Sequence, residues 1–198
     1  MQNNKIKITI DYLTIAFICI IVILSNDSKY IAAILCAICH EAGHIAVMRS
    51  CGCEKINVKV NLFNIAIADP KRGVRPYKQD IAIICAGPLV NLVMFVVFGI
   101  INTFWKSVFI RNIVFISLVL CCFNLLPIES TDGGQLLKIV LEEKFTPQTV
   151  RVIMTVLSVI FIIPLSCLSF YVLLQSRYNF TLLFTVIYFC FVTVMNFV

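Results

Sequence analysis

Residues 30–48 read YIAAILCAICHEAGHIAVM, an apolar run of the length that a helix needs to cross a bilayer, roughly 20 residues. Within it, the pentad His40-Glu41-Ala42-Gly43-His44 places two imidazoles and a carboxylate where Ile31 to Met48 carries no other charge. Ionisable groups are costly inside a membrane, and those that persist there usually serve a function. We therefore expect a membrane-spanning helix that carries a functional site.

The spacing of the pentad indicates a metal site. Four residues advance a helix by about one turn, so His40 and His44 share a face and can both bind one zinc ion. Glu41 then lies beside the metal, where its carboxylate can take a proton from a water that zinc has made more acidic. The alternative is a pair of core histidines satisfied by hydrogen bonds, because HExxH also occurs by chance in soluble helices.

The composition is that of an integral membrane protein. Hydrophobic residues make up 61% of the 198 residues and charged residues 13%, and the mean hydropathy is +1.00. We predict an all-α polytopic membrane protein that forms a single domain over residues 1–198, with about six transmembrane helices. The predicted spans are Ile8 to Leu24, Tyr30 to Met48, Gln79 to Phe104, Val108 to Leu126, Val150 to Leu174 and Phe180 to Val198.

The distribution of basic residues sets the expected orientation. Most lysines and arginines flank the spans on the side that the N-terminus faces, so the positive-inside rule places both termini in the cytoplasm. Loops that face anionic headgroups account for the net charge of +6, and no nucleic-acid partner is required. The ten cysteines lie mostly singly in the spans and form no disulfide framework. Cys51-Gly52-Cys53 is too small a donor set for a closed metal site.

A third ligand has to be a carboxylate or a thiolate, because the chain has only two histidines and the pentad uses both. Glu129 and Asp132 are the acidic candidates, in the segment 124–134, NLLPIESTDGG. Pro127 stops a helix and Gly133-Gly134 permits a turn or a close backbone approach, which predicts a broken helix that brings Asp132 to the metal. The second and fourth spans run in the same direction, so both motifs reach the cytoplasmic half. The alternative is an ordinary helix exit with Asp132 as N-cap of a helix from Gln135 to Leu141.

These motifs together resemble the site-2 protease family of intramembrane zinc metalloproteases. HEAGH matches the first family motif, and Asn124, Pro127, Asp132 and Gly133 match Asn-x-x-Pro-x-x-x-x-Asp-Gly. Gly87-Pro88-Leu89-Val90-Asn91 is similar to the family element Gly-Pro-x-x-Asn. The resemblance implies a catalytic core at about residues 30–135, a Zn²⁺ cofactor, and these roles: His40, His44 and Asp132 as zinc ligands, Glu41 as general base and acid, Asn124 as a residue that holds the substrate or its oxyanion, and Asn91 as a weaker candidate for substrate binding or for support of the ligands.

Among subgroups, the six-span layout is similar to the stage IV sporulation proteases of endospore-forming bacteria, which cleave a membrane-tethered sigma-factor precursor. The resemblance implies an enzyme of the bacterial plasma membrane with a membrane-protein substrate, and it is compatible with a regulatory membrane partner or a homo-oligomer. The sequence ends with the sixth predicted span, so we expect no nucleotide-sensing CBS domain of the kind that many of those proteases carry. It also lacks a PDZ-sized insertion.

The stretch from Ile56 to Ala68 alternates apolar and polar residues and is rich in β-branched side chains, which predicts one or two strands between the second and third spans. Such strands could hold an unwound substrate by main-chain pairing, or they could form a hairpin on the membrane surface. Two other functions remain open. One is a metallopeptidase of extramembrane peptides with Glu129 as ligand, and the other is a non-catalytic protein that binds a metal or a partner on the same scaffold.

Overall fold

The computed structural model describes residues 5–12, 14–15, 27–53, 55–61, 64–68, 75–176 and 180–197. The chain forms two compact units, Met1–Cys122 and Phe123–Val198, and each is described by itself. Helices predominate in both units, and the described strands all lie in the first.

Three helices form most of the first unit: α2 (Ser28–Ser50), α3 (Tyr77–Phe104) and α4 (Val108–Asn124), the last of which ends where the second unit begins. The N-cap of α2 is Asp27, whose side chain accepts a hydrogen bond from the backbone N–H of Lys29. The helix is followed by Gly52 in the left-handed region, with φ of 78°, and this residue turns the chain toward the sheet.

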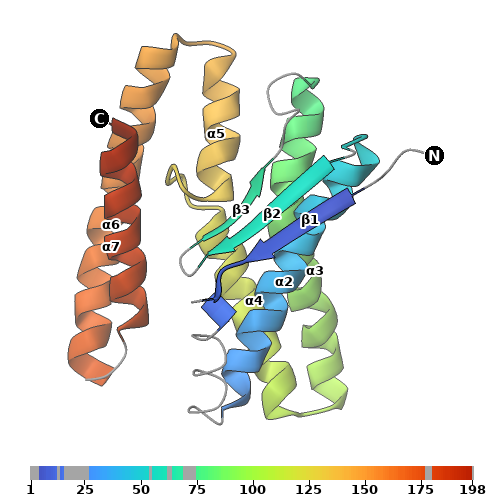
Figure 1. Ribbon diagram of the computed structural model, residues 1–198. Helices are drawn as coiled ribbons and strands as arrows, with labels where there is room; N and C mark the ends of the chain where they lie inside the picture. Colours follow the sequence, from blue (N-terminus) through green and yellow to red (C-terminus); the bar gives the residue numbers. More distant parts are fainter. Residues whose placement is uncertain are drawn as a thin grey trace. The chain divides into compact units, whose positions relative to one another are not determined.

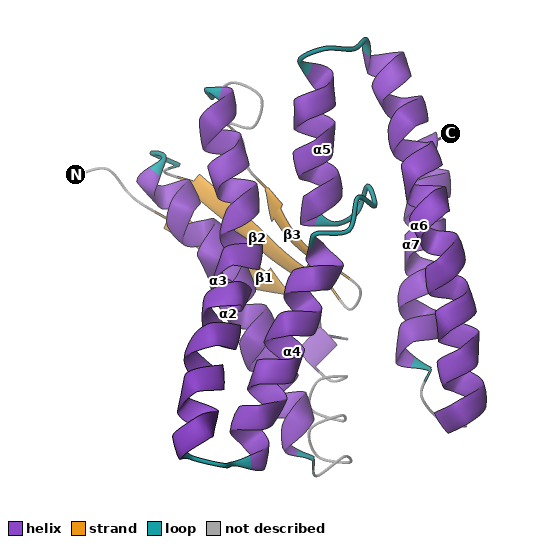
Figure 2. Cartoon of the chain, turned by 180° about the vertical axis from the view of Figure 1, so that it is seen from behind, coloured by secondary structure: helices purple, strands orange, loops and turns teal. Residues whose placement is uncertain are grey.

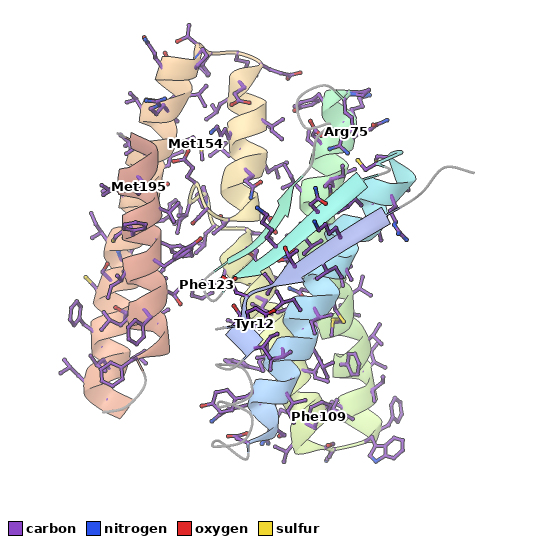
Figure 3. The ribbon with its side chains drawn as sticks, viewed as in Figure 1. Tyr12, Arg75, Phe109, Phe123, Met154 and Met195 are labelled. Atoms are coloured by element: carbon purple, nitrogen blue, oxygen red, sulfur yellow. The ribbon has the colours of Figure 1, made fainter. Side chains whose placement is uncertain are left out.

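α2 and α4 run in the same direction, as expected from the sequence. Near the start of both helices, Asn112 Nδ2 donates to Ser28 Oγ at 3.3 Å. Further along both, Cys36 Sγ and Ser117 Oγ are 3.3 Å apart. Figure 3 labels Phe109 near the start of α4 and Arg75 just before α3, toward opposite ends of this unit.

A three-stranded sheet packs against these helices (Figure 1). It consists of β1 (Lys5–Ile10), β2 (Lys55–Asn61) and β3 (Asn64–Ala68) in the order β1-β2-β3. β1 pairs parallel with β2, and β2 pairs antiparallel with β3. Ile56 and Val58 of β2 are buried against Met48 of α2 and Ile83 of α3. The predicted strands between the second and third spans are therefore confirmed as a hairpin.

The predicted first span, Ile8 to Leu24, is wrong at its start. Ile8, Thr9 and Ile10 belong to β1 and pair with Val58, Lys59 and Val60 of β2. The sequence Lys5-Ile-Lys-Ile-Thr-Ile10 has the period of two that a strand requires, and overall hydropathy conceals that alternation. Tyr12, Thr14 and Ile15 are helical, whereas residues 13 and 16–24 lie outside the described part of the chain.

The described part of the second unit contains the short helix α5 (Asp132–Glu142), the long helix α6 (Pro147–Ser176) and the helix α7 (Thr181–Phe197). α6 and α7 lie side by side, as both views show (Figures 1 and 2). Ile128, in the connection before α5, is fully buried among Ile162 of α6 and Val186 and Phe189 of α7. This packing anchors the connection that leads to Asp132.

The helices are those of a membrane protein. α2, α3 and α6 are long and apolar enough to cross a membrane, whereas the apolar parts of α4 and α7 are shorter, so the predicted count of about six spans is not confirmed. Apolar side chains of α3, such as Leu89, Val93 and Ile100, are more than half exposed. Histidine, asparagine and serine side chains are instead buried between helices. Such an arrangement suits a lipid surrounding.

Candidate metal centre

The two histidines of the pentad converge on one point. Both lie on the same face of α2, and both side chains are buried. Their Nε2 atoms are 3.2 Å apart, and the rings meet edge to face. Two nitrogens bound to one tetrahedral zinc at ~2.0–2.1 Å would be about 3.3 Å apart. The observed separation therefore fits a shared metal ion.

One stripe of α3 faces these two rings, and its members, Ile83, Gly87 and Asn91, recur every fourth residue. His44 Nδ1 is 2.7 Å from the carbonyl oxygen of Ile83. A carbonyl oxygen can only accept, so Nδ1 of His44 carries the hydrogen and, in the neutral ring, Nε2 keeps its lone pair. The amide of Asn91 lies 3.0 Å from Nδ1 of His40 and is fully buried. Both outer ring nitrogens are thus held by α3.

Gly87 keeps open the space in which the two Nε2 atoms meet. A Cβ atom at this position would lie 2.3 Å from Nε2 of His44 and 2.7 Å from Nε2 of His40. Gly43 serves close packing of the same helix pair, because a Cβ there would lie 2.9 Å from the carbonyl oxygen of Ala86. Small residues at such positions let two membrane helices approach closely. The donor set and the space beside it therefore fit a bound metal ion.

Glu41 follows His40 on α2 and is half-buried. It is therefore neither sealed in the core nor fully exposed. A carboxylate in this position can exchange protons with a bound water, which suits the role that the pentad predicts.

In the second unit, Asp132 is the first residue of α5, and Thr131 rather than Asp132 is the N-cap. The Thr131 hydroxyl oxygen accepts from the N–H of Gly134 at 3.3 Å and donates to the carbonyl of Ile128 at 2.8 Å. The predicted alternative, with Asp132 as the cap, is therefore wrong.

The two glycines after Asp132 explain how α5 can start so close to the preceding loop. A Cβ at Gly133 would meet the carbonyl of Leu125, and one at Gly134 would meet the carbonyl of Ile128, both closer than any real contact. α4 ends at Asn124, shortly before Pro127, as the broken-helix prediction requires. Asn124 itself is half-buried at that helix end.

Glu129, the other predicted ligand, is engaged within the second unit. Its Oε1 is 3.5 Å from Nζ of Lys138 on α5, and its backbone N–H donates to Ser158 Oγ at 3.1 Å. These contacts give Glu129 a structural role in holding the loop to α5 and α6.

The sequence did not reveal a buried ion pair at the start of α3. Arg75 pairs with Asp80 at 3.2 Å, and its Nη1 donates to Cys53 Sγ at 2.8 Å. Figure 3 labels Arg75 at this end of the unit. Arg75 thereby connects the turn after α2 to the start of α3, and this contact gives Cys53 a structural role. The sequence also did not reveal that the carbonyl of Ile83 contacts His44. The four-residue spacing of Ile83, Gly87 and Asn91 could have indicated this face of α3.

Comparisons with known proteins give a family match to part of the chain and a similarity of fold. The model of Peptidase family M50 matches residues 100–165. The fold is similar to that of the site-2 protease from Methanocaldococcus jannaschii, with a TM-score of 0.68 and 22% sequence identity, covering 98% of this chain and 91% of that one. No curated protein matches.

Proposed function

We propose that this chain is a zinc-dependent intramembrane metalloprotease. The observation that carries the proposal is the convergence of the two buried Nε2 atoms at 3.2 Å, with the opposite ring nitrogens held by α3. The match to Peptidase family M50 and the fold similarity to a site-2 protease support it. Zinc is the metal that this combination of ligands favours among tetrahedral sites.

The proposed ligands are His40, His44 and Asp132, a group that could hold a metal ion. Two neutral imidazoles and one carboxylate are a common catalytic ligand set, which leaves a fourth position for water or substrate. Glu129 suits this role less well, since it already pairs with Lys138. The metal, when bound, lowers the pKa of its water and polarises the carbonyl of the peptide bond.

The proposed roles of the other residues follow from their chemistry. Glu41 takes the proton from the attacking water and returns it to the amine that leaves when the peptide bond breaks. The amide of Asn124 can donate a hydrogen bond to the oxygen of the scissile carbonyl as negative charge develops there.

The proposed substrate is a membrane-tethered or transmembrane protein, because the histidines lie in a helix fit to cross a bilayer. A substrate helix has to unwind before its peptide bonds are accessible, and an outer strand of the sheet can hold it extended. β3 is such a strand, since β2 is in the middle of the sheet. A sigma-factor precursor of sporulation is the specific candidate that the family resemblance suggests, cut near the cytoplasmic side.

The test compares Glu41→Gln with the exposed control Glu142→Gln in purified, bilayer-reconstituted protein. We expect Glu41→Gln to keep its zinc and to lose cleavage of a tethered transmembrane substrate, since the ligands survive while the proton carrier is lost. Glu142→Gln should keep both its zinc and its cleavage activity. A wild-type protein that binds zinc but cleaves nothing would favour a non-catalytic metal-binding protein, and retained turnover in Glu41→Gln would remove Glu41 from catalysis.

A further inference from the structure

The hydrogen bond between Asn91 and His40 can run in either direction, with the amide as donor or as acceptor. The amide of Asn91 lies 3.0 Å from Nδ1 of His40, across the interface of α2 and α3. The oxygen and nitrogen of an amide exchange places when it turns by 180°, so the positions of the heavy atoms fit either direction. With the nitrogen toward the ring, the oxygen of Asn91 is buried and accepts no hydrogen bond.

The direction decides which nitrogen of His40 carries the hydrogen. If the amide nitrogen faces the ring, Nδ1 accepts, and in the neutral ring the hydrogen is on Nε2, where a metal would have to bind. If the amide oxygen faces the ring, Nδ1 donates and Nε2 offers its lone pair. His44 has no such choice, because the carbonyl of Ile83 requires a hydrogen on its Nδ1.

We propose that Asn91 is a positioning residue that selects the metal-binding tautomer of His40 by accepting a hydrogen bond from Nδ1 through its side-chain oxygen. The proposal rests on the proposed function, since it assumes that His40 binds a metal through Nε2. The change of tautomer moves one proton from Nε2 to Nδ1 and leaves the ring neutral. Asn91 and the carbonyl of Ile83 then perform the same task for the two histidines.

The amide suits this task in a way that a carboxylate would not. Ligating histidines commonly donate their second N–H to a carboxylate or a carbonyl, which fixes the ring and raises its basicity. A neutral acceptor does so without adding a negative charge beside the metal. The metal therefore keeps more of its positive charge for acidifying water. We expect that an aspartate at position 91 would bind metal well and catalyse less well.

The experiment measures zinc affinity of the full-length protein by competition with a chelator. The variants are Asn91→Leu, which cannot accept, Asn91→Asp, which can only accept when ionised, and the control Asn102→Leu. Asn102 lies on the same helix and also has a buried side-chain oxygen without a partner. We expect Asn91→Leu to weaken zinc binding about 10- to 100-fold, Asn91→Asp to bind at least as tightly as wild type, and Asn102→Leu to be unchanged.

A second readout follows the ring hydrogens directly. The chain has only two histidines, so nitrogen-15 NMR spectra of histidine-labelled protein report on this site alone. With zinc bound through Nε2, the hydrogen is on Nδ1 of both rings, and we expect the Nδ1 hydrogen of His40 to show the downfield shift of a hydrogen bond in wild type and in Asn91→Asp. This spectrum decides the matter even if Asn91→Leu fails to fold.

The outcomes separate the two proposals. If the wild type binds no zinc, the proposed function fails and this inference fails with it. If the wild type binds zinc but Asn91→Leu binds it equally well, or Asn91→Asp loses as much affinity as Asn91→Leu, only the role of Asn91 is overturned. An Nδ1 hydrogen of His40 that shows no hydrogen bond in the zinc-loaded wild type would overturn it as well.

Discussion

Replacing Gly87 by alanine should strongly weaken metal binding while leaving the helix in place. The added Cβ would lie 2.3 Å from Nε2 of His44 and 2.7 Å from Nε2 of His40, whereas ordinary contact begins at 3.4 Å. The His44 ring would therefore have to withdraw by about 1 Å, several times the roughly 0.2 Å that a zinc–ligand distance tolerates.

The expected cost differs between folding and metal binding. In the helix, alanine is favoured over glycine by about 1 kcal/mol, while overpacking of a core costs about 1–3 kcal/mol, so the fold should lose at most about 2 kcal/mol. Zinc affinity should fall by about 100-fold or more, since a ligand itself is displaced. At zinc concentrations that saturate the wild type, that loss alone removes about 2.7 kcal/mol of stabilisation by bound metal.

Gly99→Ala is the matched control, because a Cβ at Gly99 of the same helix meets nothing within 4 Å. The assay is the zinc content per chain after purification, measured by mass spectrometry, together with thermal unfolding with and without added zinc. We expect zinc to raise the unfolding temperature of the wild type and of Gly99→Ala but not of Gly87→Ala. A full zinc content in Gly87→Ala would refute the assignment of this space to the metal.

Two further predictions concern the third ligand and the sheet. Asp132→Asn should lower zinc occupancy, because an amide is a poorer ligand than a carboxylate, whereas Glu129→Gln should keep most of it; the reverse pattern would exchange their roles. Proline at Ile65 or at Ala66 tests both alternating positions of β3, one of which offers its N–H to the outer edge. Cleavage should fall in the variant whose proline removes the outward N–H, while its zinc and its hairpin remain. Full activity in both proline variants would rule out β3 as the strand that holds the substrate.

The features that could be predicted from the sequence depend on residues that are close together in the chain. The spacing of the pentad gave the shared face of His40 and His44, and the alternation after α2 gave the hairpin. Pro127 and the two glycines gave the broken connection before α5. What could not be predicted depends on distant contacts: the carbonyl of Ile83, which any residue could supply, and the pairing of β1 with a partner far along the chain.

The error in the predicted first span also comes from a limit of sequence-based prediction. Hydropathy averages over a window, so the predicted span included Ile8 to Ile10, the second half of the strand Lys5–Ile10, together with the apolar residues that follow it. Window averages also could not show which apolar runs form helices of full spanning length. α4 and α7 are helices as expected, yet they are shorter than α2, α3 and α6.

The pairing of β1 with β2 has a consequence for how the protein is made. Lys5 pairs with Lys55, so the strand synthesised first waits for a partner about fifty residues later, after all of α2 has been made. At about 5–20 residues per second, that interval lasts several seconds. During it the ribosome-bound chain exposes an unpaired strand edge, and Lys5 and Lys7 help to prevent wrong pairing there. A bulky tag fused directly before Lys5 would burden this step, so biogenesis rather than catalysis would limit the yield of such a fusion.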